Sequence, residues 1–206
     1  MVNQRDVYII KTRDRTEGIN LLLEKFNLDE FSGKNVAIKA NFNSADPFPA
    51  STHIQTLEAL VQNLQEAGAS ELVMAERSGM GTTSQVLEKM GVFQLSRELG
   101  FKVVVLDDEE KGDWIKIEGD ENHWLRGFYI SKIFLEAEKV VQTCCLKTHR
   151  FGGHFTLSLK NSVGLVAKKI PGSVYNYMGE LHLSPHQRSM IAEINQHYPM
   201  DLVLMD

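Results

Sequence analysis

Short apolar runs alternate with stretches of helical periodicity along most of the chain. Six runs have the length and composition of strands, at residues 7–10, 36–40, 71–75, 102–106, 139–146 and 201–205. Four stretches repeat apolar residues at helical spacing, at residues 18–26, 54–67, 84–99 and 185–196. The alternation predicts an α/β fold with an open, mostly parallel sheet flanked by helices.

Two glycines and one irregular segment refine this picture. Gly68 and Gly100 follow helical stretches at the position of a C-terminal glycine cap. A small extended insertion around residues 112–133 interrupts the alternation, and no internal repeat or low-complexity linker divides the chain. We therefore expect residues 1–206 to form a single α/β domain.

Composition and charge narrow the class of protein. With 206 residues and 43% hydrophobic positions, the chain can bury a substantial core. A formal net charge of -5 argues against nucleic-acid binding and against binding to an anionic membrane surface. There is no apolar signal core and no apolar run of the roughly 20 residues that span a bilayer. The two cysteines, Cys144 and Cys145, are adjacent, which disfavours a structural disulfide and fits a cytoplasmic protein.

Polar side chains follow nearly every predicted strand. Asn41 and Asn43 come after the second run, and Lys147 and His149 come after the fifth. In open parallel sheets, ligands bind beyond the carboxyl ends of the strands. Each residue alone suits an ordinary solvated loop, but their convergence on one edge predicts a shared pocket, with Lys39, Asn41 and Asn43 on one side of it.

The densest group of chemically useful side chains lies at residues 147–164. Lys147 and His149 precede a glycine pair, and Thr156 and Lys160 are spaced to share a helical face, with Asn161 beside them. We expect Lys147, His149 and Lys160 to form the catalytic group, the lysines positioning charge and His149 carrying a proton. A lysine nucleophile of lowered pKa remains open, as does a histidine bonded to nearby backbone.

Two further patterns suggest ligands. The turn containing Ser78, Gly79 and Gly81 precedes a predicted helix, where backbone amides can hold an anion, although Thr82 or Thr83 can instead cap that helix. His149 and His154 are the histidine pair best placed for a metal. His182 and His186 have the i, i+4 spacing, but Pro185 between them is predicted to leave His182 outside the helix.

Three of these motifs together resemble one family. Lys39-Ala-Asn-Phe42, Ser78-Gly-Met-Gly81 and the run from Lys147 to Asn161, with Lys-x-His followed by Thr-x-x-x-Lys-Asn, resemble the family catalogued as domain of unknown function 362. The resemblance runs from about Val36 to the last residue. It implies that the domain is C-terminally truncated here, because family members continue further and many carry a cysteine-rich ferredoxin-like segment. This chain has no Cys-x-x-Cys, so it does not hold an iron–sulfur cluster alone.

The leading interpretation is a strand-end cleft that binds a small anionic substrate or cofactor, with enzymatic turnover left open. The alternative is a non-catalytic metal or iron–sulfur accessory protein, whose remaining ligands come from a missing segment or from a partner. A third class is a regulatory binding module without turnover. The expected partners are accordingly a small anionic molecule and either an iron–sulfur partner or a second copy of the chain. The architecture also resembles that of nickel-pincer lactate racemases, with no residue matched.

Overall fold

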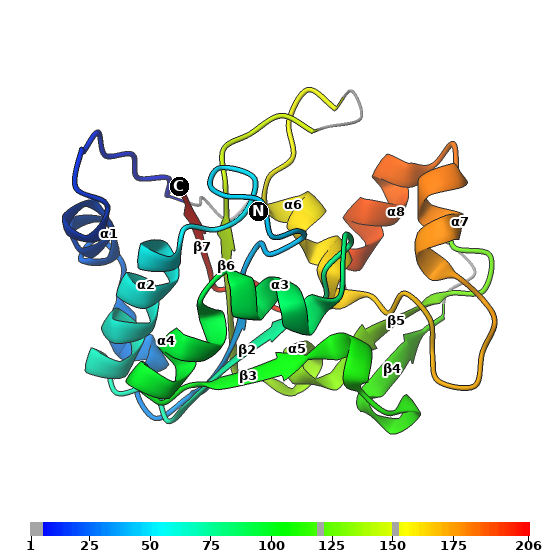
Figure 1. Cartoon of the computed structure of the whole chain (residues 1–206), viewed down its shortest axis with the longest axis horizontal. Helices are drawn as coiled ribbons and strands as arrows, with labels where there is room; N and C mark the ends of the chain where they lie inside the picture. The colour runs from blue at the N-terminus through cyan, green and yellow to red at the C-terminus, as the bar shows by residue number, and fades with distance from the viewer. Residues whose placement is uncertain (1–5, 119–121, 150–152) are drawn as a thin grey trace.

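A computed structural model describes residues 6–118, 122–149 and 153–206 (Figure 1). Five strands form one parallel sheet in the order β3-β2-β1-β6-β7. They are β1 (Asn35–Lys39), β2 (Glu71–Glu76), β3 (Lys102–Val105), β6 (Lys139–Cys144) and β7 (Leu202–Met205). Two more strands, β4 (Trp114–Ile117) and β5 (Phe128–Ser131), pair antiparallel. The predicted α/β fold is confirmed, and the small extended insertion is a hairpin.

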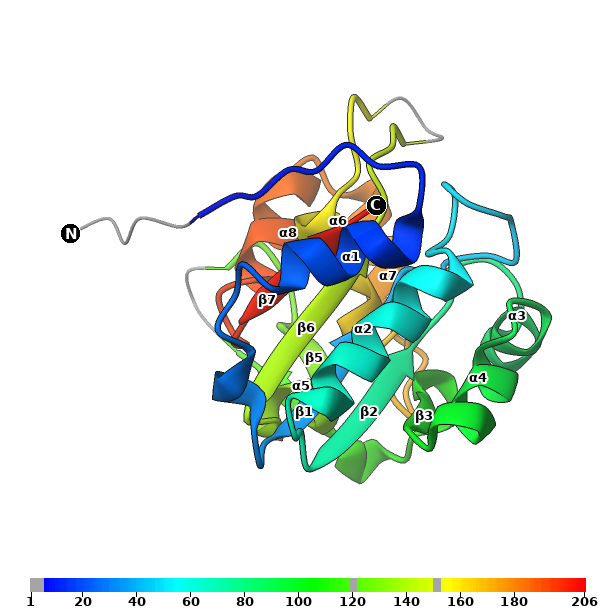
Figure 2. The same cartoon turned by 90° about the vertical axis from the view of Figure 1, so that its left-hand side faces the viewer.

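Helices cover both faces of the parallel sheet. One face carries α1 (Arg15–Leu23), α2 (Ile54–Glu66), α3 (Thr83–Lys89) and α4 (Val92–Leu99). The other carries α5 (Lys132–Glu136), the β4–β5 hairpin, α7 (Tyr177–Leu183) and α8 (Gln187–Ile194). Figures 1 and 2 show α1 and α2 on the side of the sheet opposite α7 and α8. No helix in the described ranges is long and apolar enough to cross a membrane.

The alternation of side chains along each strand creates two cores. In β1, Val36 and Ile38 pack with the α1–α4 layer, whereas Ala37 between them packs with the aromatic residues of the hairpin side. Phe128 and Ile130 of β5 are fully buried in that second core. The sheet is therefore apolar on both faces, as expected for parallel strands between helix layers, and its polar chemistry is confined to the strand ends.

Two predictions of local structure near the N-terminal half were wrong. Residues 7–10 form no strand, and Val7 and Ile9 are 82% and 92% exposed, because their apolar composition finds no neighbouring strand to pair with. The helix predicted at 84–99 is split into α3 and α4 at Gly91, whose φ of 79° ends one helix before the next begins. The caps at Gly68 and Gly100 are confirmed, with φ of 82° and 77°.

The helix expected after residue 153 is much shorter than predicted. It consists of α6 (Ser158–Asn161) and a 3-10 turn at Ser162–Leu165, so Thr156 lies in the loop before it. The prediction that Pro185 leaves His182 outside the helix at 185–196 is confirmed, because α8 begins at Gln187. His182 lies instead in the separate helix α7, which ends at Leu183, so His182 and His186 do not share one helix.

Candidate functional site

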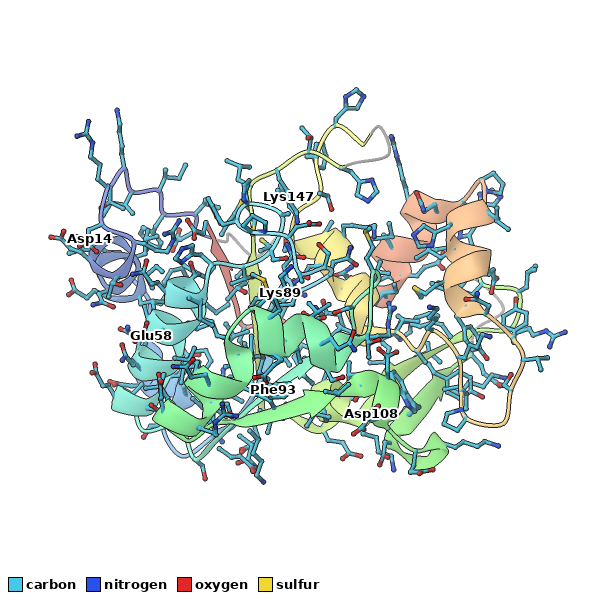
Figure 3. The ribbon with its side chains drawn as sticks, viewed as in Figure 1. Asp14, Glu58, Lys89, Phe93, Asp108 and Lys147 are labelled. Carbon is cyan, nitrogen blue, oxygen red and sulfur yellow. The ribbon has the colours of Figure 1, made fainter. Side chains whose placement is uncertain are left out.

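A cavity of about 590 Å³ lies at the carboxyl ends of β1, β2 and β6. Figure 3 shows Lys147 on the loop that follows β6, beyond the edge of the sheet. The cavity wall contains eight of the residues predicted from sequence: Lys39, Asn41, Asn43, Lys147, His149, Thr156, Lys160 and Asn161. The structure therefore brings the two lysine-bearing segments together around one space, as the spacing of the strand ends suggested.

Four predicted residues lie outside this wall. Ser78, Gly79 and Gly81 do not line the cavity, and His154 is exposed on the surface. The amide of Ser78 donates to Thr83 Oγ1 at 2.8 Å, and the amide of Gly79 donates to Asn43 Oδ1 at 3.0 Å. The amides of Ser78 and Gly79 thus have partners within the protein and hold the Asn43 loop, and the role of this turn in anion binding stays a prediction.

A buried ion pair forms the floor of the cavity. Lys39 is 2% exposed, and its Nζ donates to Glu76 Oε1 at 2.6 Å and to the Ala40 carbonyl at 2.5 Å. Glu76 is 1% exposed and also accepts from the amides of Phe42 at 3.0 Å and Arg77 at 2.9 Å. Burial lowers the pKa of Lys39, and the neighbouring Glu76 opposes that shift. The saturated carboxylate joins the ends of β1 and β2.

Asn161 connects this pair to β6. Its side-chain amide lies 3.3 Å from the Lys39 carbonyl, 3.3 Å from Gln142 Oε1 and 3.1 Å from the Thr143 carbonyl, donating toward all three. Its Oδ1 lies 3.4 Å from Lys39 Nζ. The two residues of the Lys-Asn motif therefore have different roles. Asn161 fixes α6 to the sheet, and its neighbour Lys160 lines the cavity.

Glu76 and Arg77 belong to the site but were not assigned a role from sequence. Arg77 is 5% exposed, and its guanidinium donates to the carbonyls of Val163 at 2.9 Å and Val166 at 3.0 Å. It thereby holds the 3-10 turn after α6 against the end of β2. The sequence did place both residues at the end of a predicted strand, where ligands often bind. It could not identify Glu76 as the partner of Lys39, because that contact depends on the pairing of β1 with β2, which sets Ile38 opposite Met74.

Gly164 is required by the buried ion pair. A Cβ at this position would lie 2.5 Å from Lys39 Cε, 2.9 Å from Lys39 Nζ and 3.3 Å from Glu76 Oε1. We expect Gly164→Ala to lower the free energy of unfolding by about 1–3 kcal/mol, because the buried lysine has no room to retreat. Urea denaturation measures this, with Gly112→Ala as the matched control, since a Cβ at Gly112 would meet no atom within 4 Å. Equal effects of the two changes would contradict this packing role.

Lys147 is fixed by the loop that follows β1. Its Nζ donates a short hydrogen bond to the Ala50 carbonyl, which also accepts from Asn41 Nδ2 at 3.3 Å. His53 is the N-cap of α2, and its ring nitrogen accepts from the Gln55 amide. The preceding Thr52 ties the Asn41 amide to Thr143, at 3.0 Å on each side. The loop and β6 are therefore locked together at the cavity wall.

Lys160 differs from the other cations of the cavity. Within the described ranges its ammonium group has no hydrogen-bond or ion-pair partner, although the side chain is only partly exposed. Burial lowers the pKa of Lys160 below 10.5, and the positive charges of Arg77, Lys147 and Lys39 lower it further. Burial also lowers the pKa of Lys147. Both lysines therefore give up their protons more readily than surface lysines do.

His149 lines the same cavity, and its amide donates to the Gly153 carbonyl at 3.0 Å. Burial lowers the pKa of His149 below 6.5, and the charges of Lys160, His182 and Lys147 act in the same direction. These effects favour the neutral form of the ring, which is the form that accepts a proton. No group of three His, Cys, Asp or Glu side chains arranged to hold a metal occurs among the described residues, so the metal role of His149 and His154 stays a prediction.

The family described as a domain of unknown function (DUF362) matches residues 36–206. The chain belongs to the DUF362 family. The matched range contains four strands of the parallel sheet, all of β1 except Asn35, and every predicted site residue, so the cavity is a feature of the DUF362 portion of the chain. The resemblance inferred from the three sequence motifs is thereby confirmed.

A solved structure has a fold similar to that of this DUF362 protein. The protein is similar to the lactate racemase apoprotein from Thermoanaerobacterium thermosaccharolyticum, with a TM-score of 0.63 and 19% sequence identity. The similarity covers 93% of this chain and 48% of that chain, so the protein spans about half the length of the racemase apoprotein. At this identity the likeness establishes the α/β architecture alone. No match was found among curated proteins.

Proposed function

We propose that the cavity of this DUF362 protein binds a small organic anion, such as a carboxylate or a phosphate ester, as substrate or cofactor. One observation carries the proposal, the charge of the cavity wall. Among the described residues, its cations are Lys39, Arg77, Lys147 and Lys160, and its carboxylates are Glu76 and Asp46. The chain as a whole has a formal net charge of -5, so this concentration of positive charge is local.

Lys147 and Lys160 are the expected anchors of the bound anion. Lys39 is paired with a buried carboxylate, and the Arg77 guanidinium donates to two backbone carbonyls. Lys147 donates to the Ala50 carbonyl and has no carboxylate partner in the described ranges, so its ammonium group keeps further donor hydrogens for a ligand, as does that of Lys160. Asn41, Asn43 and Thr156 supply neutral hydrogen-bonding groups on the surrounding wall. In this arrangement the lysines position negative charge and His149 exchanges a proton with the bound molecule, which is a setting for catalysis as well as for binding.

The cellular setting is part of the same proposal. Both cysteines are buried free thiols, and burial raises the pKa of Cys144 to about 12. Thiols in this state suit a reducing compartment, which supports a cytoplasmic protein acting on a soluble metabolite. The proposal requires no nucleic acid and no membrane surface as partner.

Thermal stabilisation by anions tests the binding function. A panel of inorganic phosphate, sulfate and small carboxylates is expected to raise the melting temperature, since a ligand that binds only the folded state stabilises it by mass action. Lys147→Met is expected to abolish the shift, and Lys168→Met is the control because Lys168 is an exposed lysine outside the cavity. No shift with any member of the panel, or equal shifts in both variants, would refute anion binding in this cavity.

Anion affinity is also expected to depend on pH. The lysines bind an anion in their protonated form, and their pKa values in the free protein lie below the ordinary 10.5. Affinity should therefore be full below these lowered values and decline as the pH rises through them, at lower pH than for a site of exposed lysines. Titration with phosphate above pH 8 measures the decline, because phosphate keeps a constant charge there. Affinity that stays level until pH 10.5 would contradict the lysine contacts.

A further inference from the structure

The cations of the cavity wall fall into two kinds. Lys39 is neutralised by Glu76, Arg77 donates to two backbone carbonyls, and Lys147 donates to the Ala50 carbonyl. Lys160 alone of the four has no acceptor within the described ranges. A cation without an acceptor, in a wall with three other cations, is electrostatically unfavourable. Lys160 therefore does not stabilise the fold through its charge, which points to a role in binding or chemistry.

The Lys160 amine also opens onto the cavity. No fully buried side-chain nitrogen or oxygen in the described part of the chain lacks a hydrogen-bond partner. Because Lys160 Nζ has no partner, it must retain contact with the open space, and the residue lines the cavity. The nitrogen is thus accessible to a bound molecule, while the base of the side chain is held by α6, which Asn161 anchors to the sheet.

We infer that Lys160 is a nucleophilic amine that forms an imine with a small oxo acid held in the cavity. The inference rests on the proposed function, because the carboxylate of the oxo acid takes the place of the anion and is bound by Lys147. The arrangement assigns the two lysines different tasks. Lys147, already oriented by Ala50, holds charge, and Lys160 supplies a lone pair when it is neutral.

The reaction is balanced without any further reagent. The neutral Lys160 nitrogen attacks the carbonyl carbon, the C–N bond forms, and the carbonyl π electrons move to oxygen. One proton passes from nitrogen to that oxygen, and we assign its transfer to His149, which lines the same cavity. Loss of the hydroxyl as water, with the second nitrogen proton, leaves the C=N bond. The sum is an amine plus a ketone giving an imine plus water.

The local charges favour this chemistry at Lys160 over the other lysines. Lys39 is sealed beneath Gly164 and paired with Glu76, so it cannot reach a ligand as a free amine. Three positive neighbours disfavour the protonated form of Lys160 and leave a larger neutral fraction at a given pH. An imine formed there would regain positive charge on protonation, next to the carboxylate of the same molecule.

Reductive trapping tests the inference. The protein is incubated with glyoxylate or pyruvate and cyanoborohydride, which reduces an imine to a stable secondary amine, and the modified lysine is found by peptide mass spectrometry. The expected adduct adds the mass of the oxo acid less one oxygen atom, at Lys160, about tenfold faster or more than at exposed Lys168, because burial and the neighbouring cations lower the pKa of Lys160 and leave more of it neutral. Lys160→Arg should remove this adduct, and Lys168→Arg should leave it unchanged.

The outcomes separate the two proposals. Modification distributed over exposed lysines, with Lys160 unmodified, would overturn the imine, and if phosphate still stabilises the same preparation the anion site stands. Absence of both trapping and stabilisation would refute both. Because the mapping is made on the unaltered protein, a poorly folded Lys160→Arg variant does not spoil it. Competition labelling of all lysines over a pH series adds a second measurement, and a titration of Lys160 no lower than that of Lys168 would also overturn the inference.

Discussion

Glu76→Gln is expected to lower the free energy of unfolding by about 3–5 kcal/mol, the usual loss when one partner of a buried ion pair is removed. The carboxylate is 1% exposed and accepts hydrogen bonds from Lys39, Phe42 and Arg77. A neutral amide leaves the Lys39 charge uncompensated at the floor of the cavity and turns donor hydrogens toward existing donors. Chemical denaturation with matched m-values measures the change.

Two further variants make this test specific. Lys39→Met combined with Glu76→Leu removes both charges and should recover much of the loss, because the penalty comes mainly from the unpaired charge. Glu71→Gln breaks the exposed pair with Lys102, whose side chain is 70% exposed, and should cost at most about 1 kcal/mol. If Glu76→Gln costs no more than Glu71→Gln, the buried pair is not the structural centre of the site.

Removing both Lys147 and Lys160 is expected to have the largest effect on binding. Lys147→Met combined with Lys160→Met should weaken affinity for a small organic anion by roughly 100-fold or more, since each charged hydrogen bond contributes about 1.5–3 kcal/mol. Both side chains line the cavity, and neither is paired with a carboxylate in the described ranges. Isothermal titration calorimetry with phosphate and with a small dicarboxylate measures the loss.

A double variant at exposed positions provides the matched comparison. Lys168 and Lys169 lie outside the cavity wall and are exposed, so Lys168→Met with Lys169→Met changes the net charge by the same amount. The affinity of this control should stay within about twofold of the unaltered protein at physiological salt, where distant exposed charges are largely screened. An equal loss in both double variants would show that net charge, and not the cavity, governs binding.

The sequence pattern predicted the sheet because parallel strands between helices are continuously apolar. Residues 36–40, 71–75 and 139–146 contained the observed strands β1, β2 and β6 almost to the residue. The same apolar composition predicted a strand at residues 7–10, where none forms. A strand also needs a neighbouring strand to pair with, and the sequence of one segment does not show whether that neighbour exists. The predicted helix boundaries were wrong where one glycine adopts a positive φ and ends a helix, as Gly91 does between α3 and α4.

The site was predictable to the extent that it consists of strand ends. Lys39 ends β1, Asn41 comes just after it, and Lys147 comes after β6. Because β1 and β6 are neighbours in the parallel sheet, these residues meet at the same edge. Glu76 could be recognised as a partner for Lys39 only from the pairing of β1 with β2, which is a long-range property. The sequence also could not show that the amides of Ser78 and Gly79 bond to the side chains of Thr83 and Asn43, because Asn43 comes from a distant segment.

The most direct measurement of the central claim is a crystal structure of the protein soaked in selenate, located by the anomalous scattering of selenium. The account predicts a selenate within hydrogen-bond distance of both Lys147 Nζ and Lys160 Nζ, in the cavity at the ends of β1, β2 and β6. It also predicts that the peak disappears in the Lys147→Met and Lys160→Met double variant. Selenate bound only at the outer surface, with the cavity occupied by water alone, would contradict it.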